Sequence, residues 1–302
     1  MNQMGRDLFT KRIKRDLYRL SFKEESVPAI QRTLKTVVLL FAVMWPGQQP
    51  SRAQTGPCAT VVPGRALPDL IVDADRLKSD IVVTIENFSR HACAVVEGCV
   101  SSRGKHELLR FSSATPNIGQ GDLVIGNPDD CPNLFEQSEC HNHLHFHEYS
   151  DYRLWTDAGY QMWEALREAG APTNTGYNAM LLANAVANGE LIVGRKQGFC
   201  LIDIERYDPS ASPQRKYTLC GGPGSPGNQG LQAGWSDVYG QQLDCQYIEI
   251  DQLKAGVYVL EDHVNPEQLL PESDYTNNTA RVRFQYVPGR GKSAGEVTIL
   301  ED

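Results

Sequence analysis

The segment Cys140-His141-Asn142-His143-Leu144-His145-Phe146-His147 contains four of the chain's seven histidines, one at every second position. Alternate side chains of a β-strand point to the same face. On a strand, His141, His143 and His145 would therefore present three imidazoles together. Imidazole nitrogen binds copper, zinc, nickel and iron, so the segment predicts a β-strand that holds a metal ion.

This strand is not expected to be straight. On an extended strand the Cα atoms of His141 and His145 would lie about 13 Å apart, too far for both imidazoles to reach one ion. We therefore expect a bend or bulge. His147 lies about 7 Å further along and is expected either to support the ligands or to lie on the surface. The alternative to a specific site is a solvated histidine patch.

The sequence from Leu67 onward is typical of β-strands. Short apolar and β-branched runs alternate with clusters of Gly, Pro and Asn, which favour turns. The clearest runs are residues 81–85, 108–111, 247–250, 257–260 and 280–286, and turn clusters occur at 119–121, 126–128 and 221–230. The pattern predicts a mainly β fold, with one antiparallel, β-sandwich-like domain with long loops over residues 67–302.

Residues 160–188 depart from this pattern. Apolar residues recur at helical spacing from Met162 to Gly170, and again from Met180 to Gly189. Glycine commonly follows the last turn of a helix. Two short helices are therefore predicted within the β domain.

Composition excludes several classes of protein. The 302 residues include 29 Lys and Arg against 37 Asp and Glu, a net charge of −8, with 41% hydrophobic and 22% charged residues. These fractions are those of a globular chain rather than a disordered one. The acidic balance argues against a general nucleic-acid binder. No apolar run reaches the roughly 18 residues that span a bilayer, which excludes a polytopic membrane protein.

The first 53 residues resemble an export signal. A basic stretch, 1–36, precedes a short apolar run, 37–45, and the small residues Ser51 and Ala53 follow at signal-peptidase spacing. Residues 54–66 would form a leader. Without cleavage, the apolar run could remain as a membrane anchor.

Cleavage after Ala53 would remove ten basic and four acidic residues, so the net charge would fall from −8 to −14. Such a surface attracts cations such as polyamines or lysine-rich proteins, although solubility alone would also explain it.

All eight cysteines follow residue 53, and none forms a C-x-x-C pair. An even number in an exported chain predicts up to four disulfides rather than a zinc site. Copper is the preferred metal for the histidines, because this compartment is oxidising and no carboxylate completes an obvious zinc-hydrolase motif.

Further motifs follow one another in a fixed order. They are Leu67-Pro68-Asp69-Leu70, the Cys93/Cys99 spacing, Cys140-His141-x-His143-x-His145 continued by Glu148, Ser150 and Tyr152, Gly194–Leu201, Asp237-Val238-Tyr239-Gly240 with Asp244-Cys245-Gln246, and Asn265-Pro266 with Pro271–Asn278. Each motif alone is modest. The ordered set resembles the catalytic domain of the lysyl oxidase family, copper-dependent protein-lysine amine oxidases, over most of residues 67–287.

The resemblance implies that His141, His143 and His145 bind Cu²⁺ and that Lys196 and Tyr239 become lysine tyrosylquinone (LTQ). Copper and O₂ would oxidise the Tyr239 ring, and the neutral amine of Lys196 would add to it. The cofactor would oxidise primary amines to aldehydes, with release of ammonia and hydrogen peroxide. Lys196 must then be desolvated or charge-shifted, because a free lysine is protonated at pH 7.

The sequence leaves the general base open. Asp237 and Glu148 are both candidates, and either could be an ordinary carboxylate near the site. Asp274–Asn278 is expected to be a structural turn that ties strands together.

The resemblance also implies disulfide pairings that would brace the copper strand and the quinone strand. They are Cys93–Cys140, Cys99–Cys245 and Cys200–Cys220, which leaves Cys58 with Cys131. One bridge of the animal enzymes has no counterpart, since Trp235 and the stretch Ile204-Glu205-Arg206 stand where its two cysteines would be.

The segment near 160–188 looks like an insertion relative to the family, placed between the copper strand and Lys196. Two roles are open for it. It could cover the mouth of the active site and select amines, or it could be an addition to a distant surface.

The sequence therefore predicts an exported amine oxidase, extracellular or periplasmic, that acts with O₂ on peptidyl lysine or small primary amines. No nucleic-acid partner is expected, and no stable membrane insertion unless the N-terminal segment is uncleaved. The first alternative is a secreted copper-binding protein of the same fold, which would not require both Lys196 and Tyr239. A zinc-dependent hydrolase built on the same histidines is a weaker alternative.

Overall fold

The computed structural model describes residues 64–301 except 139, 141, 169–174 and 197, all within one compact unit, Gly56–Asp302. The predicted N-terminal segment 1–53, most of the leader 54–66, Cys58 and His141 lie outside the described residues. In the described chain every strand pairing is antiparallel. The predicted mainly β fold is confirmed.

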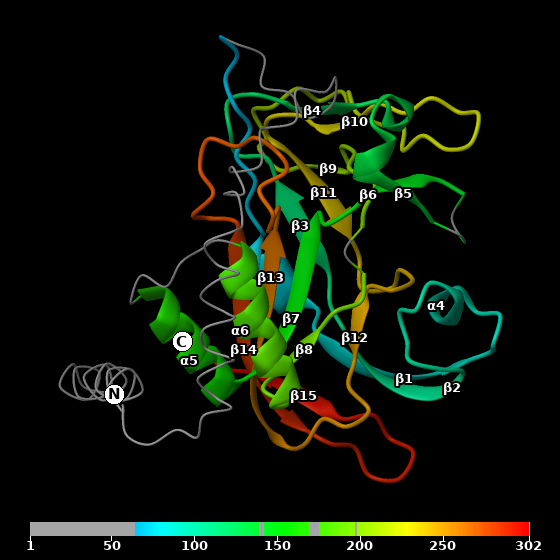
Figure 1. Cartoon of the computed structure of the whole chain (residues 1–302), viewed down its shortest axis with the longest axis vertical. Helices are drawn as coiled ribbons and strands as arrows, with labels where there is room; N and C mark the ends of the chain where they lie inside the picture. The colour runs from blue at the N-terminus through cyan, green and yellow to red at the C-terminus, as the bar shows by residue number, and fades with distance from the viewer. Residues whose placement is uncertain (1–63, 139, 141, 169–174, 197, 302) are drawn as a thin grey trace, which may run out of the picture. The chain divides into compact units, whose positions relative to one another are not determined.

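A five-stranded sheet forms the centre of the fold, in the order β15-β14-β13-β7-β8 (Figure 1). Its strands are β7 (Ser150–Thr156), β8 (Leu191–Val193), β13 (Gly256–Val264), β14 (Thr279–Val287) and β15 (Glu296–Ile299). The middle strand, β13, pairs along its length with both β7 and β14. Because side chains alternate along a strand, this sheet has two faces with different partners.

Smaller antiparallel sheets surround the central one. They contain β1 (Val82–Phe88), β2 (Gly104–Arg110) and β12 (Tyr247–Glu249); β3 (Ser113–Pro116), β11 (Trp235–Tyr239) and β9 (Glu205–Arg206); β4 (Leu123–Gly126) and β10 (Gln229–Leu231); and β5 (Phe135–Gln137) and β6 (Leu144–Phe146). Short helices lie in the connections: α3 (Ala74–Ser79), α4 (Cys93–Val96), and the 3₁₀ turns η1 (Pro128–Asp130) and η2 (Pro132–Leu134).

The inner face of the central sheet carries the main core. Tyr152, Leu154 and Leu260 are buried there, in one apolar cluster with residues of β1, β2, β11 and β12. Tyr152 makes an edge-to-face contact with Phe111, with ring centroids 4.9 Å apart. Packed antiparallel sheets of this kind agree with the sandwich-like fold predicted from the sequence.

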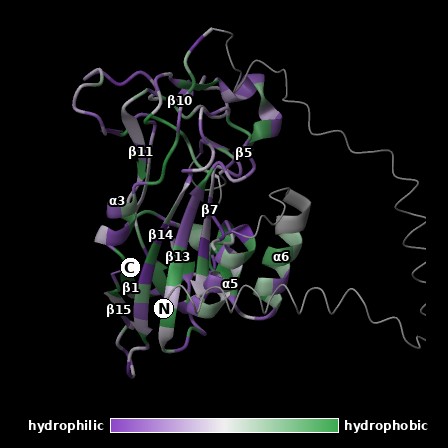
Figure 2. Ribbon diagram, turned by 90° about the vertical axis from the view of Figure 1, so that its left-hand side faces the viewer, coloured by the Kyte–Doolittle hydropathy of each residue, from purple (hydrophilic) through white to green (hydrophobic). Residues whose placement is uncertain are grey.

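The outer face of the central sheet is covered by the two predicted helices, α5 (Asp157–Glu168) and α6 (Thr175–Ala187). Figure 2 shows both helices on one side of β7 and β13. Trp155 and Val259 face them, and Trp155 stacks on Trp163 of α5 with ring centroids 5.5 Å apart. Among the described residues, no helix combines the length and the apolar character needed to cross a membrane.

Helix α5 begins three residues earlier than the sequence pattern indicated, at Asp157. The Oγ1 atom of Thr156 accepts a hydrogen bond of 3.1 Å from Gly159 N and so caps the first turn. Gly189, with a φ of +71°, follows the end of α6. A left-handed glycine commonly ends a helix, which explains why this boundary could be predicted.

Three of the four implied disulfides are present in the structure. They link Cys93 to Cys140, Cys99 to Cys245 and Cys200 to Cys220. The first joins α4 to the segment before β6, and the second joins the following loop to the segment before β12. The fourth pairing, Cys58 with Cys131, stays a prediction because Cys58 lies outside the described residues.

The predicted structural turn, Asp274–Asn278, lies at the end of the connection between β13 and β14. Glu272 accepts hydrogen bonds from the side-chain amides of Asn265 (2.6 Å) and Asn278 (2.8 Å) and from Leu70 N (2.6 Å). The Asn277 amide donates to Asp69 Oδ1 at 2.9 Å. These bonds fix the β13–β14 connection to the start of the domain.

Candidate active site

The segment predicted as a copper strand is shorter than expected. Only Leu144–Phe146 form a strand, β6, while Asn142 and Glu148 take positive φ values of 53° and 56°. The prediction that the alternating histidines share one strand is therefore wrong, because His143 and His147 lie before and after β6. The expected bend is present.

Tertiary contacts account for this bend. The Cys93–Cys140 disulfide holds the start of the segment, and Leu144 N donates to Gly221 O at 3.1 Å. After β6, His147 Nε2 lies 2.8 Å from the carbonyl oxygen of Asn133. His147 thus ties the turn to η2, which fits a structural role better than that of a metal ligand.

His143 and His145 are the two predicted ligands that the structure describes. Their Nε2 atoms lie 2.9 Å apart, and their ring centroids lie 4.7 Å apart. Two imidazole nitrogens that converge on one point suit a borderline cation such as Cu²⁺. His141 lies outside the described residues, so its part in the ligand set stays a prediction.

The segment that contains Lys196 and Phe199 lies directly against this pair. Phe146 of β6 and Phe199 form an antiparallel bridge through two backbone hydrogen bonds of 2.7 and 3.0 Å. A Cβ atom on Gly198 would lie 3.3 Å from the Cβ of His145 and would collide with Glu136. Glycine at 198 therefore permits the close approach of the two segments.

Tyr239 ends β11 and points at the same segment. Its hydroxyl donates to Cys200 O at 2.8 Å and accepts from Cys200 N at 2.9 Å. Its ring meets Phe199 edge-on, with centroids 4.6 Å apart. Burial, and secondarily the charge of Asp237, raise the pKa of this phenol well above its usual value.

Lys196 lies over the Tyr239 ring. Its Nζ is 5.0 Å from the ring centroid of Tyr239 and 5.0 Å from that of Phe199. Burial lowers the pKa of Lys196, and the carboxylates of Glu97, Asp237 and Asp244 oppose that shift. The amine is therefore more readily neutral than an exposed lysine, as addition to an oxidised tyrosine ring requires.

The two candidate bases lie in different places. Asp237, two residues before Tyr239 on β11, is 1% exposed, and burial raises the pKa of its carboxyl group well above the usual value. Side chains two apart on a strand share a face, so Asp237 lies on the side of Tyr239. Glu148 instead lines a cavity on the outer face of the central sheet. The geometry favours Asp237.

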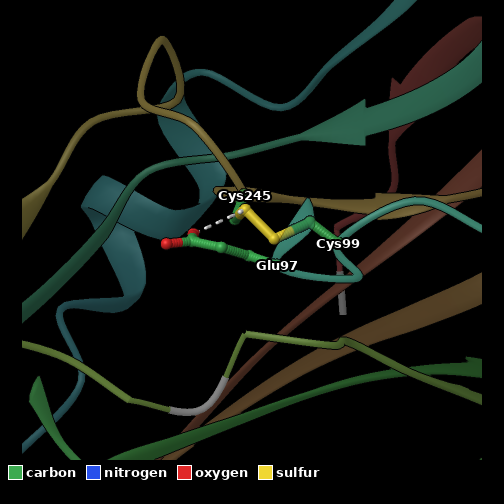
Figure 3. A group of neighbouring side chains, drawn as sticks. All are labelled: Glu97, Cys99 and Cys245. Atoms are coloured by element: carbon green, nitrogen blue, oxygen red, sulfur yellow. Dashed lines mark hydrogen bonds between the residues drawn. A yellow bond between two sulfur atoms is a disulfide. The ribbon is translucent and has the colours of Figure 1, made fainter. Parts of the chain in front are cut away.

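Glu97 is a site residue that the motif comparison missed. Its Oε1 accepts hydrogen bonds from Ser138 Oγ at 2.5 Å and from Cys140 N at 3.2 Å, and Glu97 is the first of the carboxylates that raise the pKa of Lys196. Figure 3 shows its side chain beside Cys99 and Cys245, with Oε2 3.8 Å from Cys245 Sγ. The group is not a metal site, because the two sulfurs are bonded to each other. Its position between Cys93 and Cys99 is the feature of the sequence that could have identified it.

The insertion lies away from these residues. A cavity of about 280 Å³ lies between the two helices, α5 and α6, and the strands β7 and β13. Its lining includes Trp163, Asp151 and Glu261. Neither Lys196 nor Tyr239 lines it. The described part of the insertion packs on the outer face, whereas Tyr239 reaches the inner face through Phe199 and Tyr152. Of the two roles considered, this placement supports the distant one.

Comparison with known proteins agrees with the motifs. The family model for lysyl oxidase matches residues 178–294, which contain Lys196, Tyr239 and the closing turn. The chain is 28% identical to human lysyl oxidase homolog 1 over 79% of its own length and 36% of that protein. It is 29% identical to human protein-lysine 6-oxidase, over 76% of the chain and 48% of that protein.

Mouse lysyl oxidase homolog 2 is 28% identical over 76% of the chain and 26% of its own length. The chain thus spans about a quarter to a half of these curated relatives. The chain is therefore similar to the lysyl oxidase family, at 28–29% identity to these relatives and through the family model over residues 178–294.

Proposed function

We propose that the chain is a copper- and quinone-dependent amine oxidase that deaminates primary amines oxidatively. The observation that carries the proposal is the position of Lys196 Nζ, 5.0 Å from the ring centroid of Tyr239, on a segment bridged by backbone hydrogen bonds to the histidine strand. A lysine, a tyrosine and a converging imidazole pair are the protein groups that this cofactor requires.

The residues present fit copper and lysine tyrosylquinone. His143 and His145, with His141, would hold Cu²⁺, and Lys196 and Tyr239 would be the precursors of LTQ. Bound copper and the mature quinone would supply the oxidation of a primary amine to an aldehyde by O₂, with release of ammonia and hydrogen peroxide. The remaining tasks belong to ordinary side chains.

Those tasks are orientation and proton transfer. Cys200 fixes the Tyr239 hydroxyl through its backbone groups, and Phe199 sets the plane of the ring. Asp237 is the proposed base for proton removal from the substrate carbon, since it is buried on the Tyr239 side of β11 and burial raises the pKa of its carboxyl group, which makes it a stronger base than an exposed aspartate. Glu97 holds the backbone of Cys140 and balances the charge of Lys196.

Charge and disulfides support a substrate class and a compartment for this proposal. The formal net charge of −8 favours cationic substrates, either lysine side chains of basic proteins or small primary amines. Three disulfides support an oxidising compartment, and we propose that the protein is secreted or periplasmic.

Peptide mass spectrometry on the folded, copper-loaded chain tests the proposal. A covalent link between the Lys196 and Tyr239 peptides is expected, and it should be absent from protein produced without copper. The chain supplies its own control, because Lys216 Nζ also lies 5.1 Å from a tyrosine ring, that of Tyr217. That pair should remain unmodified.

Two unmodified peptides in copper-loaded protein would instead support a copper-binding protein of the same fold. One observation favours this alternative: both backbone groups of Cys200 bind the Tyr239 hydroxyl, as for a purely structural tyrosine. The cross-link would also exclude a zinc-dependent hydrolase.

A further inference from the structure

A second group of potential metal ligands lies on the sheet β1-β2-β12, away from the histidine strand. His106 belongs to β2, Glu249 ends β12, and Asp251 lies in the turn that follows. One ligand atom from each of the three lies within 4.8 Å of the others. β2 and β12 are hydrogen-bonded neighbours, with Glu249 opposite Leu108, so the three residues stand on a rigid frame.

The ring of His106 has a defined orientation. The ring is 5% exposed, and Nε2 lies 2.8 Å from the carbonyl oxygen of Ser102, so this nitrogen carries a proton and donates. Nδ1 faces Asp251 Oδ2 at 2.8 Å and Glu249 Oε1 at 3.5 Å. In a neutral ring, the Nδ1 lone pair would point at two carboxylates. A cation must lie between them, either a proton or a metal ion.

The two carboxylates are also held in place. Glu249 accepts hydrogen bonds from Ser101 N at 2.6 Å and Ser101 Oγ at 2.7 Å. Asp251 Oδ1 accepts one from Glu107 N at 2.6 Å. Metal-binding histidines commonly donate their second ring nitrogen to a carbonyl group, and ligating carboxylates are themselves hydrogen-bonded. Both features are present here.

The spacing suits a small divalent ion. Two ligands about 2.1 Å from Zn²⁺, at angles of about 85–115°, lie about 2.8–3.5 Å apart. The Nδ1–oxygen distances of 2.8 and 3.5 Å match these limits. The carboxylates are 19% and 28% exposed, so solvent can reach the group and complete the coordination. One imidazole with two carboxylates suits Zn²⁺ better than Ca²⁺ or Mg²⁺, which prefer oxygen alone.

We propose that His106, Glu249 and Asp251 form a second metal site, for a divalent transition ion such as Zn²⁺, separate from the copper ligands. Its role is structural. Ser101, which holds Glu249, follows Cys99, and Cys99 is cross-linked to Cys245 just before β12. A bound ion would fasten β2 to β12 and its turn, and the hydrogen bonds of Ser101 to Glu249 and of Ser102 to His106 would hold the loop beside it. An ion that binds the folded chain but not the unfolded chain would raise the stability of the fold.

Zinc titration of the full, copper-saturated chain tests the proposal, with bound zinc measured by elemental analysis and affinity by calorimetry. His106→Gln should remove one equivalent of zinc or weaken its binding at least about tenfold, and should abolish the zinc-dependent rise in melting temperature. His91→Gln is the matched control, because His91 is exposed and contacts Arg90 rather than a carboxylate. It should bind zinc as the unchanged chain does.

Asp251→Asn provides a second test if the His106 variant folds poorly, since an amide keeps the size of the side chain and can still accept from Glu107 N. Loss of the same zinc equivalent in this variant supports the site. Equal zinc stoichiometry and affinity in the Asp251 variant, the His91 variant and the unchanged chain would overturn the proposal. The group would then be a proton-bridged ion pair only.

Discussion

Two lysines lie over tyrosine rings at almost the same distance. Lys196 Nζ is 5.0 Å from the Tyr239 centroid, and Lys216 Nζ is 5.1 Å from the Tyr217 centroid. We call these the candidate pair and the reference pair. Their contact geometry is alike, so any difference in chemistry between them must come from their surroundings.

The surroundings shift the pKa values of the two amines in opposite directions. Burial lowers the pKa of Lys196, whereas the hydrogen bond from Lys216 to Asp122, 2.6 Å long, raises the pKa of Lys216. The Lys216 side chain is 54% exposed. The candidate pair also adjoins the histidine strand through Phe199 and Phe146. We therefore expect that contact between a lysine and a tyrosine does not suffice for the proposed cofactor, and that a deprotonated amine and a nearby copper site are also needed.

The largest expected effect is a complete loss of activity. Tyr239→Phe should retain the fold and the copper yet form no cross-link and oxidise no amine, because the ring could not become the quinone. Tyr217→Phe should leave activity unchanged, since the Tyr217 hydroxyl contacts Asp122 at 3.4 Å and Lys216, and neither residue belongs to the candidate site. Hydrogen peroxide release from a primary amine measures both. Amine oxidation by the Tyr239 variant would contradict the proposed role of Tyr239 and remove the distinction between the two pairs.

Asp237→Asn should have the next largest effect. Loss of a general base costs about 10²- to 10⁴-fold in rate. The rate should be measured per cross-linked molecule, so that a defect in cofactor formation is not counted as a defect in turnover. Asp244→Asn is the matched control, because Asp244 also raises the pKa of Lys196 but is exposed. Equal losses of rate in both variants would show that Asp237 contributes only its charge and is not the base.

Much of the site could be predicted because motifs report local chemistry. The two helices were inferred from the spacing of apolar residues, whereas the lysine and tyrosine segments and the three disulfide pairings were implied by the resemblance to the lysyl oxidase family. The bend at the histidines was expected, but the restriction of the strand to Leu144–Phe146 was not, and its reason is long-range. The segment is held by the Cys93–Cys140 bridge and by the hydrogen bond from Leu144 N to Gly221 O, which no local pattern encodes.

Side-chain roles on the helices were also beyond the sequence. Met162, Met180 and Val186 fit the helical spacing, yet all three are about half exposed, and Trp163 provides the buried contact with Trp155. Periodicity showed that helices form, but the face that packs depends on which sheet lies beneath. Glu97 was missed for the same reason, since its partners Ser138 and Cys140 lie more than 40 residues away.

Glu97→Gln should shift the pH dependence of cofactor formation. Glu97 raises the pKa of Lys196, so its removal should lower that pKa and move the midpoint of cross-linking to lower pH. At pH values below the midpoint, a fall of one unit in the pKa of Lys196 would raise its neutral fraction about tenfold. The expected rise in the Glu97 variant is smaller than this. Cross-linking after copper addition, followed by mass spectrometry at several pH values, measures it.

Glu164→Gln is the control for that shift, because Glu164 lies on α5 and pairs with Arg281, remote from Lys196. Its midpoint should equal that of the unchanged chain. A midpoint that moves to higher pH in the Glu97 variant would show that Glu97 acts on Lys196 through packing rather than charge.

The smallest expected effect concerns the reference pair itself. Asp122→Asn removes the ion pair with Lys216, which is worth about 0.2–1 kcal/mol for partly exposed partners, so thermal unfolding should change little. The pKa of Lys216 should fall toward its ordinary value, because its largest raising contact is lost. The Tyr217 peptide should nevertheless stay unmodified after copper treatment at high pH, where the amine is neutral. Modification of Tyr217 under these conditions would show that a neutral amine and contact suffice, and that a neighbouring histidine pair is unnecessary.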